Sequence, residues 1–288
     1  MADDILPFEK TRDPNLSRRG FAALSLGAGA AAAGAALADA PADDIDVVVK
    51  TADGSCDAAL FHPAGKGRWP GVVMFTDVLG LRPAFREMGR RLAAQGYTVL
   101  VPNPFYRTRK APVLSGPFDF TKPEDRAKLV ELTAPLTNEA RNHDVTAYIG
   151  FLDALPTVKS KTKMGVVGYC MGGPYTMLAA SIAPDRVGAG ASFHGGGLVT
   201  DKPDSPHLLI PRIKASYYFG IAANDDARQP DAKTQLKVAF DKAQLPAKID
   251  VYEGCQHGWC VSDGAVYNKA GAERAWSELI TLYAKALV

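Results

Sequence analysis

The sequence of 288 residues is poor in cysteine and has no dominant charge. It contains four cysteines, too few for a disulfide scaffold, and it has neither a Cys-x-x-Cys pair nor a His-Glu-x-x-His motif, so no strong zinc signature is present. Lys and Arg number 33 against 31 Asp and Glu, and no basic run dominates any segment, which gives no electrostatic case for binding nucleic acid. The composition, 47% hydrophobic and 22% charged, excludes wholesale disorder.

The first forty residues predict an export signal. Ser-Arg-Arg-Gly-Phe at 17–21 precedes an uncharged stretch rich in alanine and glycine, which ends in the small-x-small cleavage pattern Ala-Leu-Ala at 36–38. Twin arginines in this setting are typical of a bacterial Tat signal. We expect residues 1–38 to be a Tat-type signal peptide, cleaved after Ala38 or after Ala40. The Tat export machinery would then be a partner, and the mature protein would be periplasmic.

A membrane anchor is the alternative interpretation of the same stretch. Its 17 uncharged residues, 21–37, are short and weakly hydrophobic for a span of about 20 residues, so we expect no stable membrane anchor after cleavage. The remaining residues, 39–288, have a suitable length for a single α/β domain. No internal repeat or low-complexity linker divides residues 41–288.

Short apolar segments predict the strands of a sheet. Some of them, such as 71–75 and 164–167, are unbroken apolar runs, which is typical of strands buried on both faces in a parallel sheet covered by helices. The predicted strands cover residues 45–50, 56–62, 71–76, 97–101, 163–168, 188–193, 216–221 and 248–252.

Longer amphipathic stretches between the strands predict helices. The alternation of strands and helices favours a doubly wound α/β sheet with helices on both faces. Residues 102–122, rich in Pro, Phe and Tyr, are expected to form a long loop, and such loops often line a binding site. The predicted helices cover residues 82–95, 138–155, 174–183, 231–244 and 270–286.

The most informative segment is Gly-Tyr-Cys-Met-Gly-Gly at residues 168–173. It follows a predicted strand and opens a predicted helix, so it has the nucleophile-elbow pattern Gly-x-Ser-x-Gly with Cys170 in place of serine. The glycines let the helix pack close to neighbouring strands, and the helix N-terminus favours an anionic sulfur. The N–H of Met171 would face a developing oxyanion. A buried structural cysteine is the alternative, against which the strand–turn–helix context argues.

A nucleophile needs a base and a group that orients the base. In this fold class the chain order is nucleophile, acid, histidine, and His257 follows the last predicted strand, where ligand chemistry sits in open α/β sheets. His194 lies too early in the chain to be the base and is expected only near the pocket. The penultimate strand is followed by Asp225 and Asp226. We choose Asp225 because it occupies the first turn position, and Asp226 stays open as the alternative.

Together these residues resemble the dienelactone hydrolase family of the α/β-hydrolase fold, over about residues 45–285. The resemblance rests on the elbow, on Asp225, on Tyr-Glu-Gly at 252–254 leading into His-Gly-Trp at 257–259, and on Asp-Val-Leu-Gly at 77–80 followed by a helix. It implies a mostly parallel eight-stranded sheet with helices on both faces. It also implies hydrolysis of small carboxylic esters and lactones, without a metal or an organic cofactor.

The resemblance assigns roles to individual residues. The reaction would pass through a thioester on Cys170, with His257 as base and Asp225 orienting it. The second oxyanion donor, beside Met171, would be the N–H of Val78.

Two departures from the family pattern concern substrate binding. Asp77 stands where the lactonase pattern has a Glu that engages the resting thiol. Arg107 resembles the first of two arginines that grip a substrate carboxylate, whereas Val261 stands where the second would fall. The aromatic side chains near these positions suggest an apolar or aryl acyl group, with core packing as the alternative; they are Phe105, Tyr106, Phe118 and Trp259.

Two further interpretations stay open. A non-enzymatic periplasmic binding protein could keep the hydrolase fold without turnover. Cys255 and Cys260, on either side of His257, could form a disulfide in an oxidising compartment, which would allow a redox role, or could be two packed thiols.

Overall fold

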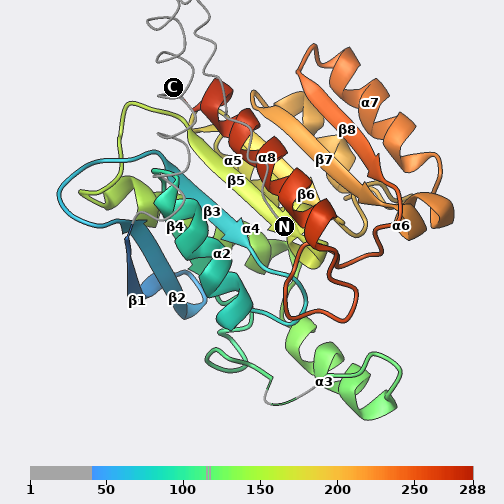
Figure 1. The fold of residues 1–288 in the computed structure, drawn as a ribbon, viewed down its shortest axis with the longest axis horizontal. Helices are drawn as coiled ribbons and strands as arrows, with labels where there is room; N and C mark the ends of the chain where they lie inside the picture. Colours follow the sequence, from blue (N-terminus) through green and yellow to red (C-terminus); the bar gives the residue numbers. More distant parts are fainter. Residues whose placement is uncertain (1–40, 115, 117, 288) are drawn as a thin grey trace, which may run out of the picture. The chain divides into compact units, whose positions relative to one another are not determined.

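An eight-stranded mixed sheet lies at the centre of the computed structural model, which describes residues 41–114, 116 and 118–287 (Figure 1). The strand order is β1-β2-β4-β3-β5-β6-β7-β8. Strands β3 to β8 run parallel, whereas β2 pairs antiparallel with both β1 and β4. The strands are β1 (Ala42–Thr51), β2 (Gly54–Pro63), β3 (Gly71–Phe75), β4 (Thr98–Pro102), β5 (Met164–Tyr169), β6 (Val187–Phe193), β7 (Ser216–Ala222) and β8 (Ala247–Tyr252).

Helices cover both faces of this sheet. On one face, helices α4, α5 and α7 pack through the buried side chains of Tyr148, Met177 and Phe240, respectively. On the other face, helices α2 and α8 pack through Leu92 and Leu279. Burial of each such side chain contributes about 1.5–3 kcal/mol. The helices are α2 (Pro83–Ala94), α3 (Pro123–Thr133), α4 (Asn138–Ala154), α5 (Gly173–Ile182), α6 (Ala223–Arg228), α7 (Ala232–Lys242) and α8 (Lys269–Ala286), with the 3-10 turns η1 (Cys170–Gly172) and η2 (Pro206–Arg212).

The predicted α/β class is confirmed, and every predicted strand and helix is present. Their ends agree within two residues, except that β1 begins three residues earlier than expected. Strands β3 and β5 are buried along their whole length, as their unbroken apolar sequences indicate. The edge strand β1 is mostly exposed. The predicted signal peptide at residues 1–38 lies outside the described residues.

Helices α3 and α6 were not expected from the sequence. Helix α6 has six residues, too few for an apolar periodicity to be detected. Helix α3 is mostly exposed and has no continuous apolar stripe. Its Leu132 packs with Phe105 and Val113 of the predicted loop, and Met171 contacts the same cluster. The loop and α3 therefore lie beside the elbow.

One edge of the sheet gathers the chemically interesting side chains. Parallel strands end at a common edge, where ligand sites form in open α/β sheets. Asp77, Cys170, His194, Asp225 and His257 all follow the carboxyl ends of β3, β5, β6, β7 and β8. Within the described ranges, no helix has the length and apolar character needed to cross a membrane.

Candidate active site

The elbow holds Cys170 in a left-handed backbone conformation. Strand β5 ends at Tyr169, and Cys170 has φ +51°, which costs about 1–3 kcal/mol for a residue other than glycine. A Cβ atom on Gly168 would lie 2.0 Å from the carbonyl oxygen of Gly172, and one on Gly172 would lie 2.5 Å from that of Phe75. The two glycines are therefore needed for the chain to turn this tightly.

Two residues of α6 hold His257. Its Nδ1 lies 2.6 Å from Oδ2 of Asp225, and its backbone N–H donates to Oδ1 of Asn224 at 2.8 Å. Asp226 points elsewhere, because both of its carboxylate oxygens accept from Lys233, at 2.6 and 2.7 Å. Of the two candidate acids, Asp225 is the one that contacts the imidazole.

The surroundings of His257 favour its protonated form. Burial by itself lowers the pKa of His257, but hydrogen bonding to Asp225 and to the sulfur of Cys170 outweighs it and raises the pKa to about 10. Since Nδ1 faces Asp225, Nε2 is the ring nitrogen left for the sulfur. An imidazolium beside a thiol favours the thiolate, which is the nucleophilic form.

A second imidazole lies against this pair. The buried His194 accepts the backbone N–H of Cys170 at its Nδ1, at 3.1 Å. Its ring centroid lies 5.2 Å from that of His257 and 5.1 Å from that of Trp259, both edge to face. Burial, and then the charge of His257, lower the pKa of His194 well below its usual value, so its ring is neutral. No pattern in the sequence predicts this contact.

The two predicted oxyanion donors are free to bind a ligand. Within the described part of the chain, the N–H groups of Met171 and Val78 have no protein acceptor. The neighbouring Asp77 accepts from Arg82 at 2.7 and 2.9 Å, and from the N–H of Leu79. Arg82 also donates to Asp263, at 2.8 and 3.0 Å. The carboxylate that matches the lactonase Glu is therefore paired with an arginine.

Comparison with known proteins identifies the family of this chain. The family model described as the dienelactone hydrolase family matches residues 56–287. The chain belongs to the dienelactone hydrolase family. It is therefore an enzyme of the class that hydrolyses lactones and esters.

Individual relatives agree with this assignment. A Synechocystis sp. protein named "putative carboxymethylenebutenolidase" is 30% identical over 78% of this chain and 89% of its own length. The carboxymethylenebutenolidase of Rhodococcus opacus is 23% identical over 75% of this chain and 81% of its own. The solved structure of a "putative dienelactone hydrolase" from Klebsiella pneumoniae superposes with a TM-score of 0.73, at 19% identity, covering 85% of this chain and 99% of that one.

The structure corrects the substrate-binding roles expected for Arg107 and Trp259. Arg107 donates at 2.8 Å to both oxygens of the buried Asp144, and it also pairs with Asp53. Trp259 is 0% exposed and stacks on Tyr252. The Arg107 guanidinium is thus engaged by two carboxylates and the Trp259 indole lies inside the core, which argues against a substrate-binding role for either side chain. Phe105 is likewise buried, as its core-packing alternative allowed.

The remaining cysteines are unpaired. Cys255 and Cys260 are free, buried thiols, which agrees with the packed-thiol alternative and argues against a disulfide. Burial raises the pKa of Cys255, and it raises that of Cys260 well above the usual range. Such thiols are inert, so the redox interpretation has no support here.

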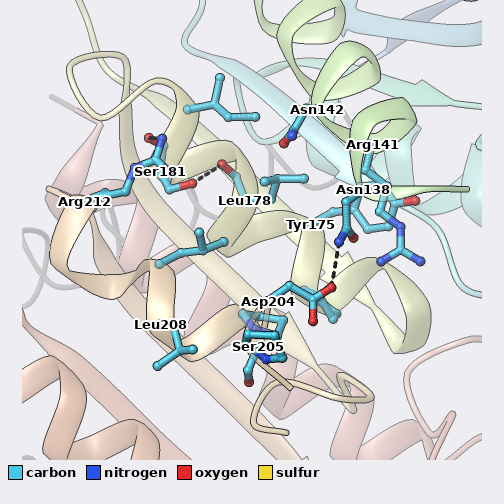
Figure 2. A pocket seen from close by; sticks show the side chains of 15 residues that line it. Asn138, Arg141, Asn142, Tyr175, Leu178, Ser181, Asp204, Ser205, Leu208 and Arg212 are labelled. Carbon is cyan, nitrogen blue, oxygen red and sulfur yellow. Dashed lines mark hydrogen bonds between the residues drawn. The ribbon is translucent and has the colours of Figure 1, made fainter. Parts of the chain in front are cut away.

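A pocket of about 460 Å³ lies beside the elbow helix, between α4, α5 and residues 203–212 (Figure 2). Arg141 lies over the ring of Tyr175 at one end, Leu178 lines the wall, and Arg212 lies at the other end. Cys170 and His257 do not line it. The pocket flanks the helix and is separate from the candidate active site. In the described residues, no group of three or more His, Cys, Asp or Glu side chains could hold a metal ion.

Proposed function

We propose that this dienelactone hydrolase relative cleaves small carboxylic esters or lactones through a thioester on Cys170. His257 is the general base and acid, and Asp225 orients it. The observation that carries the proposal is the hydrogen bond of His257 Nδ1 with Asp225, together with a Cys170 sulfur near enough to raise the pKa of the same imidazole. A base that lies between a nucleophile and an orienting acid is the constellation that covalent acyl transfer requires.

Acylation begins from the thiolate of Cys170 and the protonated His257. The sulfur attacks the carbonyl carbon, a C–S bond forms, and the carbonyl electron pair moves to the oxygen. The N–H groups of Met171 and Val78 donate to this oxyanion. The C–O bond to the leaving alcohol then breaks as the alcohol oxygen takes the proton from Nε2 of His257. In a lactone the alcohol stays attached to the acyl group.

Deacylation uses the now neutral His257 as a base. A water molecule gives a proton to Nε2 while its oxygen attacks the thioester carbon. Collapse of the second tetrahedral adduct breaks the C–S bond, which restores the thiolate and releases the carboxylic acid. Asp225 keeps Nδ1 as the donor towards itself in both steps, so that Nε2 always faces the reaction.

Replacement of the nucleophile tests this function. We expect Cys170→Ala to lower kcat/KM for 4-nitrophenyl acetate by at least about 10³-fold, because no other described thiol contacts His257. Cys255→Ala is the matched control, since Cys255 is a buried thiol outside the constellation. Mass spectrometry of the wild-type protein under turnover should find one acetyl group on Cys170.

Two outcomes would contradict the proposal. Turnover that survives in a folded Cys170→Ala variant would exclude the thioester route. A wild-type protein that binds esters and lactones but turns over none of a panel of lactones, enol esters and aryl esters would favour the periplasmic binding protein instead.

We also propose that the protein is exported to the periplasm by the Tat machinery. The support is the twin-arginine segment at 17–21 and the Ala-Leu-Ala pattern at 36–38. An oxidising compartment would expose the nucleophile to oxidants, since Cys170 is partly exposed whereas the other three thiols are buried.

A further inference from the structure

His194 occupies the point at which the elbow interrupts the pairing of β5 with β6. The last residues in register are Tyr169 and Phe193, so Cys170 and His194 would form the next pair. Both leave the extended conformation, with φ of +51° and +40°. The N–H of Cys170 then donates to the His194 side chain instead of to a backbone carbonyl. The imidazole thus continues the hydrogen-bonded ladder by one step after the backbone has turned away.

The backbone around His194 is fixed independently of this contact. Its own N–H donates to the carbonyl of Gly220 in β7, at 2.8 Å. The carbonyl of Cys170 accepts from Gly196, two residues beyond His194, at 3.1 Å. The bond to β7 holds the backbone of His194 independently of Cys170, and the Gly196 bond is a second link between the loop after β6 and the elbow.

The contact requires one protonation state of the ring. An N–H group can donate to Nδ1 only if that nitrogen carries no proton, so the proton of the neutral ring lies on Nε2. His194 is 1% exposed, and the protonated His257 lies against it, so a second positive charge at this place is disfavoured. In the described residues Nε2 of His194 has no hydrogen-bond partner. The ring is therefore held in place by its contacts with Cys170, Tyr169, His257 and Trp259 although Nε2 stays unpaired.

We propose that His194 is a positioning residue for the reaction, which holds the backbone of Cys170 through Nδ1 and the ring of His257 through edge-to-face contact. One side chain thereby sets the separation between nucleophile and base. The expected effect of His194 on turnover rests on the proposed function. A displacement of about 1 Å between reacting groups costs about 10²-fold in rate, so the loss of this support affects kcat more than KM.

Two substitutions at His194 distinguish the effect of the hydrogen-bond acceptor from the effect of the size of the ring. Asn tolerates a positive φ and carries an amide oxygen near the place of Nδ1, whereas Leu has similar bulk and no acceptor. For 4-nitrophenyl acetate we expect His194→Leu to lower kcat about 10- to 100-fold with KM changed less than about 3-fold. We expect His194→Asn to recover most of that loss. A merely structural role would lower Tm in both variants without this difference in kcat per folded molecule.

A second measurement does not depend on hydrolysis. The rate of Cys170 alkylation by iodoacetamide is followed against pH in the wild-type, Leu and Asn proteins. We expect the Leu variant to lose the fast alkylation at neutral pH and the Asn variant to keep it. If the Leu variant does not fold, His194→Gln replaces it, because its amide oxygen lies near Nε2 and cannot reach Cys170 N–H in the same way.

The results distinguish the two proposals. A folded Leu or Gln variant with wild-type kcat and a wild-type alkylation profile would overturn the role of His194. Turnover that persists in Cys170→Ala would overturn the proposed function, and the alkylation profiles would still decide the role of His194.

Discussion

The segments that follow β6 and β8 place the ring centroids of two histidines 5.2 Å apart, and the pKa values of the two rings are shifted in opposite directions. Burial lowers the pKa of both rings. At His257 the Asp225 carboxylate and the Cys170 sulfur reverse that effect and raise the pKa to about 10. At His194 the partner is an N–H donor, which needs the neutral ring. Burial therefore lowers the pKa of His194 unopposed by any carboxylate, whereas at His257 the Asp225 carboxylate outweighs it.

The two histidine rings are therefore suited to different roles in the candidate site. In the proposed mechanism the His257 ring exchanges a proton with substrate and water through Nε2. The neutral ring has its acceptor nitrogen occupied by a backbone group and so has no basic lone pair to offer. Opposite protonation states of neighbouring groups are a common mark of an acid–base site and its supports.

The largest effect is expected from removal of the charged ring. His257→Gln should lower kcat/KM for 4-nitrophenyl acetate by about 10³- to 10⁴-fold, because the proton then has no carrier in either step. His207→Gln is the control, since His207 contacts Ser205 outside the site. Steady-state rates with matched folding, checked by circular dichroism, give the comparison. If kcat/KM of the His257→Gln protein stays within 10-fold of the wild-type value, His257 is not the base of the reaction.

An intermediate effect is expected from removal of the carboxylate that distinguishes the two rings. Asp225→Asn should lower kcat about 10²-fold or more, and it should bring the pKa of His257 down from about 10 towards its usual range, because the group that raises it is gone. Titration of the imidazole by NMR reads this shift directly. Asp226→Asn should change kcat by less than about 3-fold, since Asp226 pairs with Lys233. Equal losses in the two variants would contradict the assignment of the acid.

The smallest effect is expected in the pH dependence of stability. The raised pKa of His257 contributes stability that is fully present below about 6.5 and is lost as pH rises towards about 10. The lowered pKa of His194 contributes stability that is present above about 6.5 and is lost as the medium becomes more acidic. Urea unfolding at acid, neutral and alkaline pH should therefore show a smaller alkaline loss in His257→Gln and a smaller acid loss in His194→Asn. Parallel curves for all three proteins would mean that folding shifts the pKa of neither ring, which would contradict both assignments.

Local sequence patterns were enough to predict most of the fold and the centre of the site. The strands, the elbow at Cys170 and the loop position of His257 depend on apolar runs, glycine spacing and chain order, all of which are visible in the sequence. The choice between Asp225 and Asp226 needed coordinates, because one step along a short helix changes the direction of a side chain by about 100°.

The features that the sequence did not reveal depend on contacts between distant segments. Arg107 looked available for a substrate carboxylate, but Asp144 of α4 neutralises it. Asp77 was identified only as a departure from the lactonase Glu, and the structure shows that Arg82 holds its carboxylate. The support that His194 gives to Cys170 depends on the β5–β6 register. No periodicity or motif contains information on such pairings.

The uneven burial of the four thiols has a practical consequence. Cys56, Cys255 and Cys260 lie inside the core, whereas Cys170 is partly open to solvent. A small electrophile added to the native protein should therefore be consumed in a ratio of one per chain. Its consumption counts competent molecules directly, so preparations can be compared on an absolute scale before any physiological ester has been chosen.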